Sequence, residues 1–394
     1  MLIGLDCAAC GAPHDAAAPV NVCSRCGRSL SARYELGALA EALRNRRMDD
    51  RPRSMWRYAE ALPTTTVADR VTLGEGFTPL VPIARIAARF GAASVDVKDE
   101  SANPTGSFKA RGLSAAVTAA VARGARSFAL PSAGNAAGAL AAYAARAGLP
   151  GRVYLPADAP QSNRVEVRLL NADVREVTGN IADAAARMRA DRAAEPAQGA
   201  PFDLSTLKEP FRLDGKKTLG YELFEAFRGV LPDVIVYPTG GGTGLLGMAK
   251  AFDELERAGL LGAARPSFVA VQSAEVASIV RAFDTGAEES TAASGGRTLA
   301  SGLNVPRAFA DWWILKELRR THGAAIAVND GEILDTIRDV ARTEGLLLCP
   351  EGAATVAALA RLADAGRIRG ARVVVFNTAS AFKYPEALER ALAG

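Results

Sequence analysis

Short apolar runs alternate with longer amphipathic stretches over most of the chain after residue 93. The runs are rich in valine and typical of strands buried on both faces, whereas the stretches between them have helical spacing. The predicted strands are Ser94–Lys98, Ser127–Leu130, Arg152–Leu155, Val174–Val177, Val234–Tyr237, Phe268–Gln272 and Val373–Asn377. The predicted helices include Asn135–Ala147, Gln161–Asn171, Ile181–Ala194, Lys217–Arg228 and Leu245–Ala258. This alternation indicates an α/β fold with parallel-rich sheets covered by helices on both faces.

A lysine lies where the first of these strands turns into a helix. Residues 103–106 read Asn-Pro-Thr-Gly, a turn sequence, and Ser107 is a suitable N-cap for an alanine-rich helix running to Gly124. Lys109 then falls in the first helical turn, where partial positive charge disfavours a cation. The same field favours a neutral amine, the form that attacks a carbonyl or carries a Schiff base. A solvated surface lysine is the alternative and, for a lone lysine, the commoner role.

Two later loops also join a predicted strand to a predicted helix. Ser132 and Asn135, with free amides at a helix start, could bind a carboxylate; the alternative is a turn capped by asparagine. Residues 239–244, Thr-Gly-Gly-Gly-Thr-Gly, present bare backbone at a helix start, which is typical of a phosphate cradle. Residues 242–247 also match the dinucleotide pattern. The next strand ends in Gln272 and not in an acidic residue, which favours a single phosphate.

Two further segments carry polar residues beside predicted elements. Arg212, Lys216 and Lys217 come just before or at the start of a predicted helix, where they could hold a second phosphate or be solvated. Thr378 follows the last strand and could face a ring nitrogen. Together with the lysine turn, the small-residue loops and Asn135, these features describe a pyridoxal phosphate site.

In that site each residue has a role. Lys109 forms the imine, Asn135 contacts the ring hydroxyl and Thr378 the pyridine nitrogen. The phosphate cradle consists of Gly240, Gly241, Gly242, Thr243 and Gly244.

The N-terminus contains two Cys-x-x-Cys pairs. Twelve residues separate them, and each pair is followed by a glycine; the four cysteines are Cys7, Cys10, Cys23 and Cys26. In a chain without a secretion signal this spacing favours a tetrahedral zinc site in a knuckle or ribbon-like segment. Reduced thiols without metal in a mobile arm are the alternative. The fifth cysteine, Cys349, is expected in the core.

Charge and hydropathy limit the kinds of partner that the protein is expected to bind. The net charge is +4 over 394 residues, and basic residues are interspersed with acidic ones, so we expect no nucleic-acid partner. No apolar run reaches membrane-spanning length, so we expect no membrane partner and a cytoplasmic location.

Several motifs resemble those of the threonine synthases, a family of fold-type II pyridoxal phosphate enzymes with the two-domain fold of the tryptophan synthase β chain. The matching stretches are residues 74–80, 103–112, 132–135, 211–218, 240–244, 350–355 and 377–384. The stretches Arg-Leu-Asp-Gly-Lys-Lys-Thr (212–218) and Phe-Lys-Tyr (382–384) point most narrowly to this family.

The resemblance implies conversion of O-phospho-L-homoserine and water into L-threonine and phosphate. It places the substrate carboxylate at Ser132 and Asn135, and the substrate phosphate at Arg212 and Ser107. We also expect a homodimer. The main alternative is another fold-type II reaction, such as a serine or threonine ammonia-lyase or a phosphoserine-dependent synthase. A zinc-knuckle adaptor and a NAD enzyme are the others.

The expected domains follow the same family. They are a zinc-binding segment (1–36), a large cofactor domain (37–93 and 186–394) and a small mobile domain (94–185) that carries the lysine and the carboxylate loop.

Four alanines depart from the family pattern. Many relatives have aspartate at position 110, some have threonine at position 136, and glycine is usual at positions 379 and 381. This chain has Ala110, Ala136, Ala379 and Ala381. Alanine at the last two positions would be strained if either needed a positive φ.

Overall fold

The chain forms two compact units of packed secondary structure. The computed structural model describes residues 1–45, 48–132, 134–157, 159–196 and 199–394. The first unit comprises Met1–Phe77, Asn103–Leu219 and Asp253–Leu260; the second comprises Thr78–Ala102, Gly220–Phe252 and Leu261–Gly394. These units are defined by packing, whereas the expected domains are defined by function and motion. The domain boundaries expected at residues 36, 93 and 185 therefore stay a prediction.

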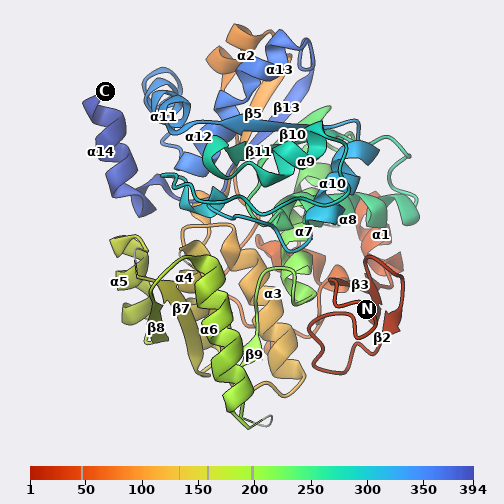
Figure 1. The fold of residues 1–394 in the computed structure, drawn as a ribbon. Helices are drawn as coiled ribbons and strands as arrows, with labels where there is room; N and C mark the ends of the chain where they lie inside the picture. Colours follow the sequence, from red (N-terminus) through yellow and green to blue (C-terminus); the bar gives the residue numbers. More distant parts are fainter. Residues whose placement is uncertain (46–47, 133, 158, 197–198) are drawn as a thin grey trace. The chain divides into compact units, whose positions relative to one another are not determined.

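Strands and helices alternate over most of the chain (Figure 1). The strands are β1 (Leu2–Cys7), β2 (Pro13–His14), β3 (Leu30–Tyr34), β4 (Leu80–Pro82), β5 (Ser94–Asp99), β6 (Phe128–Pro131), β7 (Gly151–Pro156), β8 (Asp173–Val177), β9 (Phe202–Asp203), β10 (Val234–Pro238), β11 (Ser267–Ser273), β12 (Ala324–Val328) and β13 (Arg372–Asn377). The α-helices are α1 (Gly37–Arg44), α2 (Ala84–Phe90), α3 (Lys109–Ala122), α4 (Asn135–Arg146), α5 (Gln161–Leu169), α6 (Ile181–Ala194), α7 (Phe211–Ala226), α8 (Thr243–Arg257), α9 (Ser278–Asp284), α10 (Asp311–Arg320), α11 (Asp330–Glu344), α12 (Pro350–Ala357), α13 (Leu359–Asp364) and α14 (Pro385–Ala393).

The first unit contains two sheets. An antiparallel sheet of order β2-β1-β3 is built by the cysteine-rich N-terminus, and a parallel sheet of order β8-β7-β6-β9 follows. Alternate residues of β6 enter different cores: Phe128 and Leu130 pack with side chains of α3 and α4, whereas Ala129 packs with Met188 of α6. Helices therefore cover both faces of the parallel sheet, as predicted.

The second unit is built on one six-stranded sheet of order β12-β11-β10-β13-β5-β4. All its pairings are parallel except that of β4 with β5. Val236 and Val271 belong to a core shared with α11 and α12, while Phe268 stacks on Phe252 of α8 at 6.2 Å between ring centroids. This sheet too is buried on both faces, which explains the valine-rich runs of its strands.

Most predicted elements are confirmed within one or two residues. One prediction is wrong: α7 begins at Phe211, not at Lys217. Elements without a predicted range include β4, β9, β12, the strands of the N-terminal sheet and the helices from α9 to α14. Within the described residues, no helix has both the length and the apolar character needed to cross a membrane.

Candidate active site

Lys109 is the first residue of α3, so its predicted place in the first helical turn is confirmed. The predicted capping role of Ser107 is wrong, because the N-cap is Phe108 and no side chain caps this helix. Ser107 instead offers its carbonyl oxygen to the N–H of Ala110 at 3.2 Å. Within the described part of the chain its buried Oγ has no hydrogen-bond partner, which leaves a hydroxyl available to a ligand.

Helix α7 lies against the start of α3 and brings two cations with it. Arg212 and Lys216 are four residues apart and therefore share a face of α7. The Nζ of Lys216 lies 3.4 Å from the Lys109 carbonyl oxygen. It also lies 4.8 Å from the centroid of the Phe108 ring, which the Lys109 Nζ approaches to 4.4 Å. The structure thus gathers Lys109, Lys216 and Arg212 along one helix pair.

Two glycines permit this close approach. A Cβ on Gly215 would lie 2.0 Å from the Arg111 carbonyl oxygen, and one on Gly112 would lie 2.4 Å from the Lys216 Nζ. Neither position could hold a side chain without moving the helices apart. The Gly residues of Ala-Arg-Gly and Leu-Asp-Gly are therefore helix-packing residues.

Arg212 is fully enclosed. Its Nη1 donates to the Leu204 carbonyl at 2.6 Å, while within the described residues its Nε has no hydrogen-bond partner. Burial lowers the pKa of Arg212 to about 10, against the opposing charges of Glu209 and Asp203. A buried guanidinium with an unused donor is suited to an anion.

Lys217 has neither of the roles considered for it. It is neither solvated nor directed at a ligand, because its Nζ lies 2.9 Å from the Glu254 Oε2 and 3.4 Å from the Asp214 Oδ1. The Asp214 carboxylate also accepts the hydroxyl proton of Tyr34, from β3, at 2.6 Å. All of these groups are buried, so Lys217 belongs to a structural network that joins β3 to α7 and α8.

The predicted carboxylate loop starts α4. Asn135 is the first residue of that helix, and the Ser132 Oγ accepts the N–H of Gly134 at 3.1 Å. Ala133, inside the same motif, is outside the described residues. The helix-start geometry predicted for Asn135 is thus present.

The glycine loop connects β10 to α8 in the second unit. A Cβ on Gly240 would lie 2.2 Å from the Gly302 carbonyl oxygen, one on Gly244 would lie 1.9 Å from the Tyr237 hydroxyl, and Gly242 has a φ of +72°. Gln272, near the end of β11, donates to the Thr239 carbonyl at 3.2 Å and so supports the loop. Packing therefore requires glycines, which have no side chain, at the start of α8. Their backbone N–H groups are suited to binding a phosphate.

Thr378 directly follows β13 and is nearly buried. The two alanines after it are also buried, and neither Ala379 nor Ala381 is among the described residues with a positive φ. The backbone strain considered for these alanines is therefore absent. Ala110 and Ala136 lie in the apolar core of the first unit.

One functional candidate was missed. Glu75, between two glycines in the 74–80 motif, is fully buried and accepts hydrogen bonds from the Trp56 Nε1 at 2.8 Å and the Tyr143 hydroxyl at 2.5 Å. These contacts tie Trp56 to α4, which carries Tyr143, and Gly76 donates to the Asn103 Oδ1 at 3.0 Å in the turn before Lys109. An acid inside an otherwise small and apolar motif was the available signal.

The four N-terminal cysteines converge. Their sulfur atoms all lie within 4.8 Å of one another, two of the residues being buried and two exposed. Four thiols at this separation are compatible with one tetrahedral metal ion. Cys349, by contrast, is buried at the start of α12, as predicted, and burial raises the pKa of its thiol well above the usual value.

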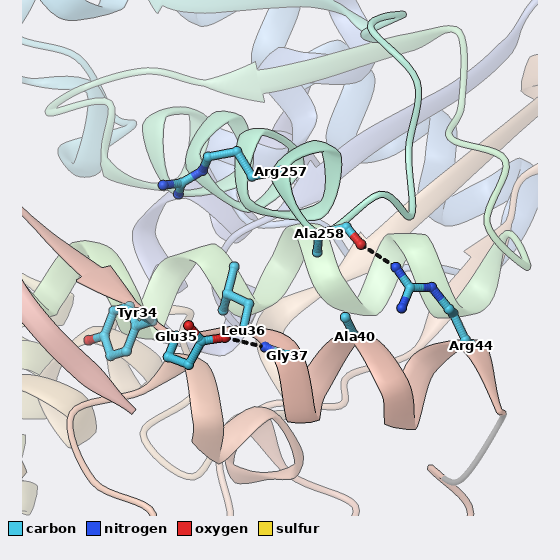
Figure 2. A pocket seen from close by; sticks show the side chains of 8 residues that line it. All are labelled: Tyr34, Glu35, Leu36, Gly37, Ala40, Arg44, Arg257 and Ala258. Carbon is cyan, nitrogen blue, oxygen red and sulfur yellow. Dashed lines mark hydrogen bonds between the residues drawn. The ribbon is translucent and has the colours of Figure 1, made fainter.

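A surface cavity of about 350 Å³ lies elsewhere in the first unit, between α1 and the end of α8 (Figure 2). Arg44 spans it to donate to the Ala258 carbonyl, and Leu36 and Ala40 line it. None of the predicted site residues lines this cavity.

Comparison with known proteins decides the family. The family model described as "Pyridoxal-phosphate dependent enzyme" matches residues 71–379, which include Lys109, Asn135, the glycine loop and Thr378. The chain belongs to this family. Membership of this family identifies pyridoxal phosphate as the cofactor.

Relatives of this pyridoxal-phosphate dependent enzyme are similar over nearly their whole length. The threonine synthase of Methanosarcina acetivorans is 33% identical over 384 residues, which are 97% of this chain and 92% of that protein. The threonine synthase of Methanocaldococcus jannaschii is 30% identical over 387 residues, 98% of this chain and 94% of that protein.

Solved structures show the same fold at lower identity. Maize serine racemase has a TM-score of 0.67 at 20% identity and covers 80% of this chain and 92% of its own. Threonine deaminase isoform 2 of Solanum lycopersicum has a TM-score of 0.64, also at 20% identity, over 80% of this chain and 84% of its own. The fold-type II architecture predicted from the sequence is confirmed.

Proposed function

We propose that the protein converts O-phospho-L-homoserine and water into L-threonine and inorganic phosphate. Relatives about one-third identical over nearly the whole chain bear the name of that activity. The observation that carries the proposal is in the first unit, where Arg212 and Lys216 share a face of α7 and Lys216 contacts Lys109. Two buried polar atoms of the same unit, the Ser107 Oγ and the Arg212 Nε, lack hydrogen-bond partners among the described residues. Such atoms fit the oxygens of a phosphate monoester.

The residues present fit the cofactor. Gly240, Gly241, Gly242, Thr243 and Gly244 would hold its phosphate, because their backbone is bare and lies at the start of α8. Thr378 would meet its ring nitrogen, and Asn135 its ring hydroxyl. When bound, the cofactor supplies an electron sink that makes the Cα and Cβ protons of the substrate acidic.

The chain's own groups would then bind substrate and move protons. Ser132 and Asn135 hold the substrate carboxylate, and Ser107 and Arg212 hold its phosphate. Lys109 would take the Cα proton and serve as acid and base in the later steps. Because Thr378 carries a neutral hydroxyl, it would hold the ring nitrogen without the charge that a carboxylate would supply. Phosphate leaves from Cγ, which gains a proton in place of the one removed from Cβ and becomes the methyl group, while water supplies the hydroxyl at Cβ and the proton that returns to Cα.

Three further assignments accompany this function. A zinc ion held by Cys7, Cys10, Cys23 and Cys26 would stabilise the three-stranded sheet without entering the chemistry. The homodimer and the cytoplasmic location stay predictions, as does a mobile small domain that closes over substrate.

The experiment is a paired product assay. Purified enzyme with pyridoxal phosphate is given O-phospho-L-homoserine, and phosphate and threonine are measured; it is given L-threonine separately, and keto acid is measured. Equal amounts of phosphate and threonine support the proposal. Keto acid from threonine, without phosphate release from the phosphorylated substrate, would contradict it and favour an ammonia-lyase.

A further inference from the structure

A buried glutamate in the second unit has no part in the function proposed so far. Glu351 is the second residue of α12 and is 3% exposed. Its Oε1 accepts the backbone N–H of Gly302 at 2.6 Å and the hydroxyl proton of Tyr384 at 3.0 Å. One oxygen thus joins the turn at residues 301–303, helix α12 and the segment before α14.

The two oxygens of this carboxyl group are unlike. Oε1 accepts two donors, whereas the buried Oε2 has no hydrogen-bond partner within the described residues. An ionised carboxylate would leave a buried charged oxygen without a donor, which is costly, whereas a neutral acid places its proton there. Burial raises the pKa of Glu351, against the hydrogen bonds from Gly302 and Tyr384. Geometry and burial both favour the neutral acid.

The partner of Glu351 touches the glycine loop. The Gly302 carbonyl oxygen lies 2.2 Å from the position of a Cβ on Gly240, so the two backbones are in direct contact. On its other side Gly302 has no space, since a Cβ there would lie 2.7 Å from the Glu351 Oε1. Gly302 is therefore held between the glutamate and the loop. A shift of Glu351 would be passed to Gly240.

We propose that Glu351 is a positioning residue of the cofactor site, which as a neutral acid holds Gly302 against Gly240 and so sets the shape of the glycine loop that receives the cofactor phosphate. This inference rests on the role of that loop in the proposed function. Glu351 touches neither cofactor nor substrate in this assignment; it acts through Gly302.

The test compares the affinities of variants for pyridoxal 5'-phosphate and for pyridoxal, which lacks the phosphate. Glu351→Met removes the acceptor from the Gly302 N–H and is expected to weaken binding of pyridoxal phosphate by about tenfold or more. Binding of pyridoxal should change little, because it does not use the glycine loop. Glu351→Gln keeps a neutral acceptor and should bind both compounds as the wild type does.

Tyr384→Phe is the matched control. It removes the other donor to the same oxygen while Gly302 keeps its acceptor, so affinity for pyridoxal phosphate should stay within about threefold of wild type. If Glu351→Met does not fold, Gly302→Ala makes the same test, because its methyl group would push Gly302 away from Glu351. The expected pattern is the same selective loss of phosphate-dependent binding.

Three results would overturn the inference. They are unchanged affinity of the folded Glu351→Met or Gly302→Ala variant, equal losses for both compounds, and a Glu351→Gln loss as large as that of Glu351→Met. A wild-type enzyme that binds pyridoxal phosphate but releases no phosphate from O-phospho-L-homoserine would refute the proposed function alone. The order of variant affinities would still decide the role of Glu351.

Discussion

Replacing Lys217 with methionine should destabilise the first unit strongly. The substitution keeps the length of the side chain but removes the charge that lies 2.9 Å from Glu254 and 3.4 Å from Asp214, with all three side chains fully buried. At an effective dielectric constant of about 20, these separations correspond to attractions of about 6 and 5 kcal/mol before desolvation is subtracted. Removing one partner of a buried ion pair typically costs about 3–5 kcal/mol, because the other charge is left uncompensated. We expect a loss of about 4 kcal/mol in the free energy of unfolding.

The measurement is urea unfolding followed by fluorescence and by hydrogen–deuterium exchange. Exchange resolves the two units, so faster exchange should appear in α7 and in β3, whose Tyr34 donates to Asp214. Lys316→Met, on the exposed surface of α10, is the matched control and should change stability by less than about 0.5 kcal/mol. The double variant Lys217→Met with Glu254→Met removes one of the uncompensated charges and should recover part of the loss. A Lys217→Met protein as stable as the Lys316→Met control would refute the buried network.

Three other changes have defined outcomes. Lys109→Ala should abolish phosphate release while thermal unfolding stays close to wild type, and retained turnover would exclude its role in chemistry. Cys7→Ser with Cys10→Ser should lower the bound zinc, measured by atomic absorption, and the melting temperature; a folded double variant with little turnover would show that the segment contributes to the active site. Burial raises the pKa of Glu209 to about 7 in the folded protein, from 4.5 in the unfolded chain. Its contribution to stability is therefore complete below about pH 4.5 and is lost as the pH rises through about 7. Relative to Glu209→Gln, the wild type should lose about 3 kcal/mol of unfolding free energy over that range, and parallel pH profiles in urea would contradict this.

Signals confined to a few adjacent residues predicted much of the structure. Valine-rich runs located the strands, and the turn before Lys109 placed it at the start of α3. The glycine loop was also predicted from adjacent residues alone, because backbone without side chains at the start of a helix is typical of a phosphate-binding site. Resemblance to the family then predicted that these separate loops bind one cofactor.

Features that depend on distant partners were not predictable in this way. The start of α7 at Phe211 was not predicted. Glycine is unfavourable inside a helix, and only the contact with Arg111 explains Gly215 there. The two roles considered for Lys217, a phosphate ligand or a solvated side chain, both missed its partner Glu254, because that residue lies on another helix. The bonds from Trp56 and Tyr143 to Glu75 likewise join segments far apart in the sequence.

The glycine contact between α3 and α7 has a mechanical consequence. With the Gly215 backbone packed directly on the Arg111 carbonyl, there is no compressible side chain at the crossing to permit sliding. We therefore expect the starts of α3 and α7, which carry Lys109 and Arg212, to move together. If Lys109 transfers the protons and Arg212 binds the phosphate, the fixed distance between these two residues would select substrates by the separation of their reacting carbon and their phosphate. A hydroxy amino acid without a phosphate group could reach Lys109 but would leave the anion site at Arg212 empty.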